Sequence, residues 1–246
     1  MLVGTIDAAR AQAAGTARFH VLALYENGGH HIEYSKAAKT WLDQLAVDSG
    51  FQIDYIQNTG KIDEAFLAGY QLFIQLDYAP YAWKESAVKA FQDYITNGKG
   101  GWIGFHHATL LGEFDGYPMW QWFSGFMGDI RYKNYIPDFA KGTVKVEDKT
   151  HPVMKGVPPS FVVEKEEWYT YDKSPRPNVR VLATVDESSY VPDSKIKMGG
   201  DHPVIWTNPN FKARNVYIFM GHSPVLFESA TYKTIFRNAI FWAAGR

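Results

Sequence analysis

Short apolar runs rich in strand-forming residues alternate with helical segments through the first half of the chain. Four runs predict strands, at residues 19–25, 51–56, 71–76 and 101–105. The segments between them carry apolar residues three and four apart and predict helices at residues 34–47, 62–69 and 85–95. Strands that alternate with helices form βαβ crossovers, which build a parallel sheet with helices on both faces. The fold class is therefore predicted to be α/β.

The second half of the chain is richer in strands. Further strands are expected at residues 142–147, 161–163, 179–185, 204–206 and 215–220, before a closing helix at residues 231–244. No linker or repeat marks a boundary, so we expect a single domain over residues 18–246. Residues 1–17 are rich in Ala and Gly, carry Asp7 and Arg10, and lack the apolar stretch of a signal peptide. They are predicted to form a flexible N-terminal arm.

Histidines follow several of the predicted parallel strands. His30 and His31 come after the first strand, His106 and His107 after the fourth, and His222 after the last. Ligands of parallel α/β sheets bind at the carboxyl ends of the strands. We therefore expect His31, His106 and His222 to converge, where they would serve acid–base catalysis or bind a metal. The alternative is that each histidine hydrogen-bonds to loop backbone.

Other polar residues lie near predicted strand ends. Glu166 and Glu167 are adjacent, and in extended backbone they would point in opposite directions, one to a pocket and one to water. Asp77 begins the loop after the third strand. His151 and His202 each precede a proline; we interpret His151 as structural, and His202 is equally compatible with a site or a structural role.

Aromatic side chains are dense at residues 117–135. Trp120, Trp122, Phe123 and Phe126 cannot all lie on one helical face. They would suit a sugar-binding wall or a homodimer interface, but ordinary core packing is the favoured interpretation.

Composition excludes several function classes. Lys and Arg total 25 against 26 Asp and Glu, and this net charge of −1 argues against nucleic acid as a partner. No apolar run is long enough to span a membrane. The chain has no cysteine, which excludes thiolate catalysis and cysteine metal sites. Without cysteine, a cytoplasmic and a periplasmic location both remain open.

Seven stretches in order resemble one family. They are GGHHIEY (28–34), GGWIGFHHA (100–108), EDKTHPVMKGVP (147–158), EEWY (166–169), VLATVDESSY (181–190), DHPVIW (201–206) and FMGHS (219–223). The chain resembles the trehalose-utilisation (ThuA-like) family of the class I glutamine amidotransferase-like superfamily. The resemblance implies a flavodoxin-like three-layer αβα sandwich with a mostly parallel central sheet. It also implies that the amidotransferase cysteine is missing, so the chain is not a glutamine amidotransferase.

The resemblance also implies a site. In the family, residues matching His31, His106, Glu167 and His222 line a pocket, and we expect these four to be catalytic. Some members hold a divalent metal, so zinc or manganese bound by the three histidines is expected as a cofactor. Substrate contacts are expected from His30, His107, Trp168, Tyr169, Asp77 and His202. His30 and His107 depart from the family pattern, which often has Arg and a small residue at these positions.

Two functions from different classes remain open at this point. The first is an enzyme, a hydrolase or a lyase or isomerase, acting on a sugar or keto-glycoside by His/Glu acid–base or metal-assisted chemistry. Glu167 or His222 would then be the base, and His31 and His106 would polarise a carbonyl. The second is a non-catalytic sugar-binding module that uses Trp120 and Trp122. In either case a small carbohydrate is the expected partner, and a homodimer through the aromatic segment is a third interpretation.

Overall fold

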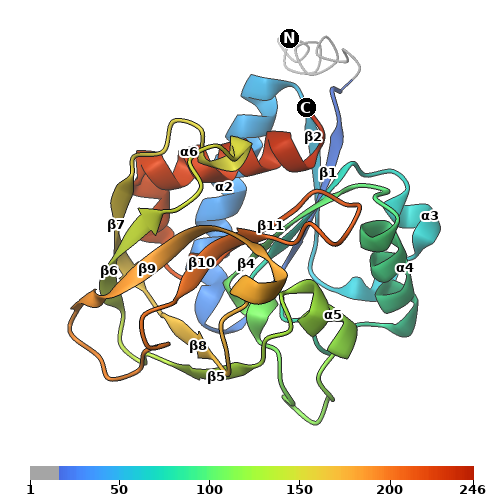
Figure 1. Ribbon diagram of the computed structural model, residues 1–246. Helices are drawn as coiled ribbons and strands as arrows, with labels where there is room; N and C mark the ends of the chain where they lie inside the picture. Colours follow the sequence, from blue (N-terminus) through green and yellow to red (C-terminus); the bar gives the residue numbers. More distant parts are fainter. Residues whose placement is uncertain (1–16) are drawn as a thin grey trace, which may run out of the picture.

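A nine-stranded sheet forms the centre of the computed structural model, which describes residues 17–246. Five parallel strands make up one half of the sheet, in the order β2-β1-β3-β4-β11. Their bounds are β1 (His20–Tyr25), β2 (Gln52–Ile56), β3 (Leu72–Leu76), β4 (Gly101–Phe105) and β11 (Asn215–Ile218). Figure 1 shows these strands side by side between helices, as the strand–helix alternation predicts. Most of residues 1–17, the expected N-terminal arm, lie outside the described residues.

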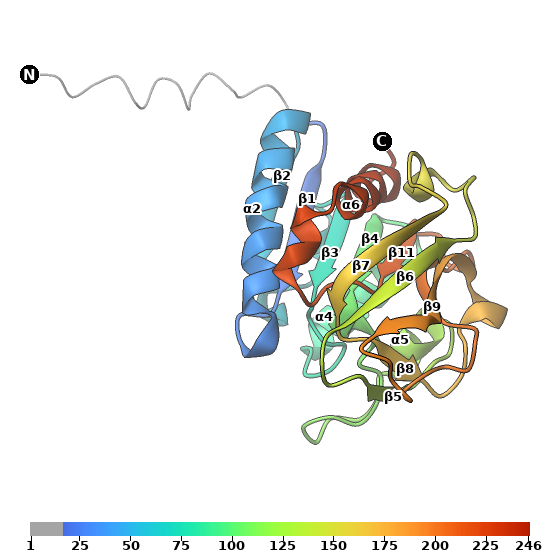
Figure 2. The same ribbon diagram turned by 90° about the vertical axis from the view of Figure 1, so that its left-hand side faces the viewer.

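The other half of the sheet is antiparallel. It adds β10 (Pro203–Thr207), β9 (Arg180–Val191), β6 (Ala140–Val146) and β7 (Ser160–Glu166) beyond β11. A separate two-stranded sheet pairs β5 (Tyr132–Tyr135) with β8 (Tyr169–Tyr171). The extra β structure expected in the second half is therefore present. Strand β7 packs against the 3-10 turn Pro224–Glu228, which follows β11, so the end of β7 returns to the parallel half (Figure 2).

Helices cover both faces of the sheet. Helices α2 (Ile32–Ser49) and α6 (Ala230–Ala243) pack on one face, and α3 (Glu64–Leu67), α4 (Glu85–Thr96) and α5 (Gln121–Phe126) pack on the other (Figure 1). Alternate side chains of β4 show this division: Phe105 contacts Phe236 of α6 with ring centroids 4.6 Å apart, whereas Trp102 contacts Phe126 of α5 at 4.9 Å. The three-layer αβα arrangement predicted from the sequence is confirmed.

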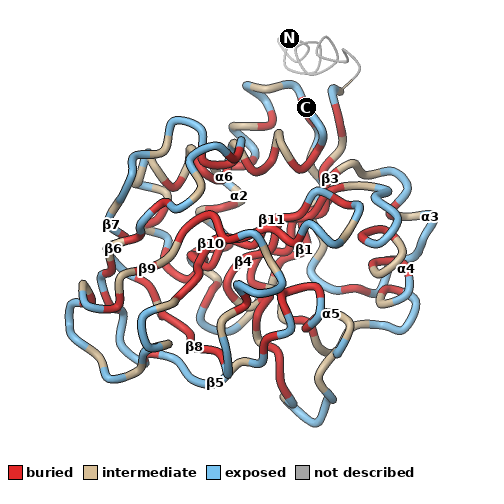
Figure 3. Tube along the Cα trace, in the orientation of Figure 1, coloured by how far each residue is buried: buried red, intermediate tan, exposed pale blue. Residues whose placement is uncertain are grey.

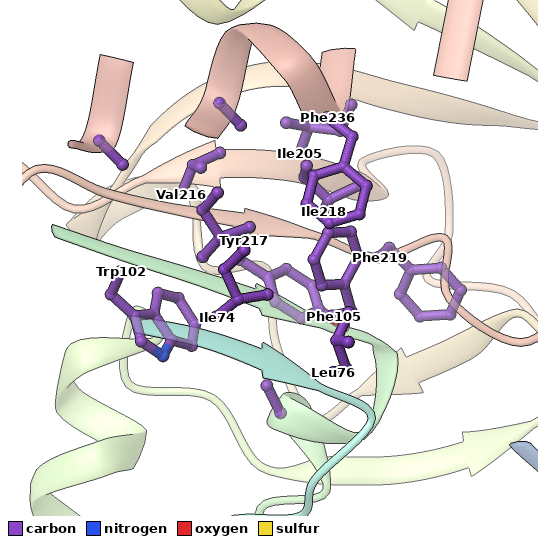
Figure 4. Packing of buried hydrophobic residues seen from close by; sticks show 14 of the residues in the cluster. Ile74, Leu76, Trp102, Phe105, Ile205, Val216, Tyr217, Ile218, Phe219 and Phe236 are labelled. Carbon is purple, nitrogen blue, oxygen red and sulfur yellow. The ribbon is translucent and has the colours of Figure 1, made fainter. Parts of the chain in front are cut away.

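Burial explains the composition of the central strands. All residues of β3, β4, β10 and β11 are buried, because helices or other strands cover both sheet faces. Figure 3 shows this buried centre, and Figure 4 shows Phe105, Ile218 and Phe236 packed together in it. Strand β6 instead alternates between buried and exposed positions. None of the helices within residues 17–246 is both long enough and apolar enough to cross a membrane.

The aromatic segment mostly contributes to the core. Trp120 and Phe123 pack against Phe91 of α4 with ring centroids 6.1 and 5.8 Å apart, and Phe123 also contacts Trp102. This agrees with the favoured interpretation of core packing. Tyr117, at the start of the segment, is exposed.

Replacement of Phe91 should measure how much this aromatic layer stabilises the fold. Phe91 is fully buried, so Phe91→Ala should lower the free energy of unfolding by about 3–5 kcal/mol. Val47→Ala is the control, because Val47 is 79% exposed and its change should stay within about 0.5 kcal/mol. Equal midpoints of urea denaturation for the two variants would contradict this view of the core.

Candidate metal centre

Four side chains from distant parts of the sequence meet at the carboxyl ends of the parallel strands. His31 lies in the 3-10 turn (Gly29–His31) after β1, His106 follows β4 directly, and His222 follows β11. Glu167 comes immediately after β7. The structure therefore brings together the three histidines and the glutamate that the sequence singled out.

The ligand atoms of this cluster lie close to one another. One ring nitrogen from each of His31, His106 and His222 and one carboxylate oxygen of Glu167 all lie within 4.8 Å of each other. His222 Nδ1 is 3.1 Å from His31 Nε2 and 3.3 Å from His106 Nε2. Glu167 Oε2 is 3.4 Å from His222 Nδ1 and 3.5 Å from His106 Nε2.

The outer nitrogens of two rings face carboxylates. His31 Nδ1 lies 3.7 Å from Glu26 Oε2, and His106 Nδ1 lies 3.7 Å from Glu166 Oε1. These separations are longer than a hydrogen bond, so we assign a proton to each Nδ1 from the charge of the facing carboxylate alone. The lone pairs of His31 Nε2 and His106 Nε2 then point into the cluster.

The charge state of the cluster agrees with this assignment. Burial lowers the pKa of His31 to about 4 and holds the pKa of His106 well below its usual value, so both rings are neutral at pH 7. Burial acts to raise the pKa of Glu167, but hydrogen bonding and charge from His106 and His222, acting when these rings carry a proton, outweigh it and bring this pKa to about 2. The cluster therefore brings several lone pairs and one negative charge together, and it holds few protons that could bridge them.

This geometry fits a tetrahedral metal site. Zinc bound at about 2.0–2.1 Å would hold neighbouring ligand atoms about 3.3–3.4 Å apart. Of the six separations among four ligand atoms, the four given above run from 3.1 to 3.5 Å, and the two from His31 to His106 and to Glu167 are within 4.8 Å. The three imidazoles and the carboxylate could thus hold such an ion, with any rearrangement falling on His31.

Glu166 lies beneath the cluster, not in water. The expectation that one of the two adjacent glutamates faces water is wrong, because β7 ends at Glu166 and the alternation of extended backbone stops there. Glu166 is fully buried, and this burial raises its pKa to about 7. Its carboxylate accepts hydrogen bonds from the backbone N–H groups of Glu167 at 3.0 Å, Gly221 at 3.1 Å and His222 at 3.4 Å. With its contact to His106, this one side chain touches three of the four cluster residues.

Glu26 pairs with His107 at the edge of the cluster, and the sequence patterns did not single it out. His107 Nδ1 lies 3.2 Å from Glu26 Oε2 and 3.1 Å from the carbonyl oxygen of Asp77. Burial opposes ionisation of Glu26, but hydrogen bonds from His107 and His31 dominate and lower its pKa to about 2. Glu26 could have been identified from its position in the sequence, because it follows β1 as Asp77 follows β3 and His106 follows β4.

The pocket above the cluster has a volume of about 610 Å³. Three residues of the cluster, His31, Glu167 and His222, line it together with the Glu26–His107 pair, whereas His106 is fully buried and is not among the lining residues. Other lining residues include His30, Tyr132, Asp138, Phe139 and Tyr169. Of the residues expected to contact substrate, His30, His107 and Tyr169 therefore lie in the pocket.

Three residues expected to contact substrate do not line this pocket. The Trp168 indole donates to the carbonyl oxygen of Ala140 at 2.8 Å and is fully buried. His202 is also fully buried, and its Nδ1 lies 3.0 Å from Glu187 Oε1. Both side chains point into the core of the antiparallel half, so the motif spacing alone misplaced them.

Asp77, the third, lies below the histidines. It is fully buried, neither of its carboxylate oxygens has a hydrogen-bond partner among the described residues, and its φ is +47°. Burial, then the charges of Glu166 and Glu26, raise its pKa well above the usual value. Gly221 allows this packing, because a Cβ there would lie 2.9 Å from Asp77 Oδ1 and from His106 Cβ.

His106 stands at the sharp corner after β4. Its φ is +33°, and the 3-10 turn His106–Thr109 begins there. The sequence puts a histidine where a nucleophile elbow would hold serine or cysteine, and this backbone conformation is strained for a residue with a side chain. His151, expected to be structural, accepts from the backbone N–H of Val153 and packs on Trp242.

The sequence and the fold match known proteins. A family model described as "Trehalose utilisation" (ThuA) matches residues 20–243. A putative ThuA-like protein from Bacteroides uniformis is similar, with 30% sequence identity and a TM-score of 0.83 over 94% of this chain and 93% of the other. A putative ThuA-like protein from Parabacteroides merdae aligns with 21% identity and a TM-score of 0.64, over 92% of this chain and 90% of the other.

The wider likeness is to amidotransferase-type folds. A putative GMP synthase protein from Thermoplasma acidophilum aligns with a TM-score of 0.59 and 15% identity, over 92% of this chain and 94% of the other. No curated protein matches this chain. The fold is therefore that of the glutamine amidotransferase-like proteins. Within that class, the chain belongs to the ThuA, or trehalose-utilisation, family.

Replacement of Glu166 should weaken zinc binding without removing a metal ligand. In Glu166→Gln, an amide NH₂ would face backbone N–H groups that now donate to the carboxylate. We expect zinc affinity, measured by isothermal titration calorimetry, to fall about 10–100-fold. Glu164→Gln is the control, because Glu164 lies on the same strand but is exposed. Equal zinc affinities for the two variants would contradict this role for Glu166.

Proposed function

We propose that this protein is a metal-dependent enzyme that acts on a small carbohydrate. One observation carries the proposal: three histidine nitrogens and one carboxylate oxygen converge next to a pocket of about 610 Å³ that His31, Glu167 and His222 line. A volume of this size is typical of sites for small-molecule ligands. The description of the family as trehalose utilisation supports a sugar as the substrate class.

In this proposal His31, His106, Glu167 and His222 hold the metal. Imidazole-rich sets suit zinc better than manganese, which prefers oxygen ligands. When bound, such an ion would supply a Lewis acid for a carbonyl or hydroxyl oxygen of the substrate, which would join the four protein ligands as a fifth. The carboxylates of Glu26 and Glu166 fix the orientation of two of the histidine rings from behind.

The Glu26–His107 pair is the proposed acid–base unit. Both atoms that contact His107 Nδ1 are hydrogen-bond acceptors, so Nδ1 carries a proton and Nε2 is the nitrogen left to accept one. His107 lines the pocket and stands outside the four-residue cluster. This assignment replaces the expected base, Glu167 or His222, because those two side chains are needed as ligands.

The reaction we propose starts with removal of a proton from carbon. His107 would take the proton from a carbon next to a substrate carbonyl, and Glu26 would stabilise the charged imidazolium that forms. The keto-glycosides expected from the family resemblance carry such a carbonyl. Tyr132, Phe139 and Tyr169 provide aromatic walls for the sugar ring.

The binding-module alternative has weaker support. It placed the sugar on Trp120 and Trp122, and most of that segment packs against α4. Saturable sugar binding without turnover by the metal-loaded protein would favour the alternative over the enzyme.

Metal analysis should distinguish a ligand from a neighbouring histidine. His222→Ala should lower zinc affinity about 100-fold or more, since it removes the ring nitrogen nearest to two of the other ligands. His30→Ala is the matched control, because His30 lines the same pocket outside the cluster. Elemental analysis of both purified variants after equal zinc loading measures the difference. Equal zinc content would contradict the proposed ligand set.

Turnover should depend on His107 even when the metal is present. His107→Ala should lower kcat on a 3-keto-disaccharide about 10²–10⁴-fold and leave zinc content unchanged. Glu26→Gln should give a smaller loss, because it removes the charge that stabilises the imidazolium but keeps the His107 ring, and its zinc content reports any separate effect through His31. Full turnover by His107→Ala would contradict its role as the base.

A further inference from the structure

A second cleft lies at the other end of the sheet from the histidines. Its volume is about 790 Å³, and Arg18, Lys155, Arg214, Arg237 and Arg246 line it. Arg18 precedes β1 and Arg214 precedes β11, so the cleft lies at the amino ends of the parallel strands. Figures 1 and 2 show that the chain enters β1 and leaves α6 at this same end of the molecule.

The arginines of the described chain divide into two groups. One group, Arg131, Arg176 and Arg180, forms ion pairs with carboxylates. Within residues 17–246, every remaining arginine lines this one cleft, and none of them forms an ion pair with a described carboxylate. They come from three separate parts of the sequence, before β1, before β11 and in or just after α6, so the fold gathers them.

The positive charge of the cleft is poorly balanced. Asp48 is the only acidic side chain among its lining residues, and its carboxylate already accepts a hydrogen bond from Gln44 at 2.8 Å. The chain as a whole has a formal net charge of −1, so this patch is not part of a generally basic surface. Positive charges held together in a cleft raise the local concentration of anions.

Three of the arginines are held in place by their surroundings. Arg237 and Arg18 lie over the ring of Phe241, with their guanidinium carbons 4.9 and 5.8 Å from its centroid. Arg214 donates to the carbonyl oxygen of Trp242 at 3.0 Å. Because folding already orders these side chains, less of their conformational entropy is lost when a ligand binds.

We propose that this arginine cleft binds a phosphorylated small molecule, at a site separate from the histidine centre. The guanidinium fork matches the geometry of phosphate oxygens. The volume of the cleft exceeds what a single phosphate needs and suits a phosphate ester. The site does not depend on the metal or on the proposed reaction.

Calorimetric titration of the full chain with pyrophosphate at constant ionic strength tests the proposal. We expect saturable binding that Arg237→Gln weakens about tenfold or more. Arg131→Gln is the matched control: it removes the same charge from an exposed arginine outside the cleft and should bind as the unmodified protein does. Absence of saturable binding, or an equal loss in both variants, would overturn the proposal.

One further variant distinguishes binding at the arginine cleft from binding at the histidine centre. Pyrophosphate also binds metal ions, so the titration is repeated with His222→Ala, which should bind pyrophosphate as tightly as the unmodified protein. Loss of binding in this variant would place the probe at the histidine centre and overturn the separate site. Competition by glucose 6-phosphate or by AMP, with glucose inactive, would support a phosphate ester and identify its class.

Discussion

The convergence of electron-pair donors in a buried space is the constraint on which the rest of this site depends. Three imidazoles and a carboxylate would repel one another there without a cation or shared protons. Burial keeps His31 and His106 neutral at pH 7, and Glu167, with a pKa of about 2, is ionised. The arrangement is therefore one that a divalent cation would stabilise.

The fold supplies the positions of these donors. Parallel strands end at one edge, so residues that follow β1, β4 and β11 meet although they are far apart in sequence. The antiparallel half brings β7 back to this edge, and Glu166 ties the backbone of Glu167 to that of His222. His106, at the strained corner after β4, contributes its ring to the cluster.

Much of this could be predicted from the sequence, because it depends on local patterns. Strand–helix alternation specifies the parallel sheet, and the histidines after its strands are readily visible. Glu166 could not be placed, because its burial depends on where β7 ends and on its contact with the loop after β11. The cleft arginines were missed for the same reason: Arg18 and Arg237 are distant in sequence and meet only over the ring of Phe241.

X-ray absorption at the zinc edge of the zinc-loaded protein tests the central claim most directly. The account predicts a first shell of about four nitrogen and oxygen ligands at roughly 2.0–2.1 Å, with the outer-shell scattering of three imidazoles. His222→Ala should remove the signal of one imidazole. A six-coordinate oxygen shell without imidazole scattering would contradict the proposed metal centre.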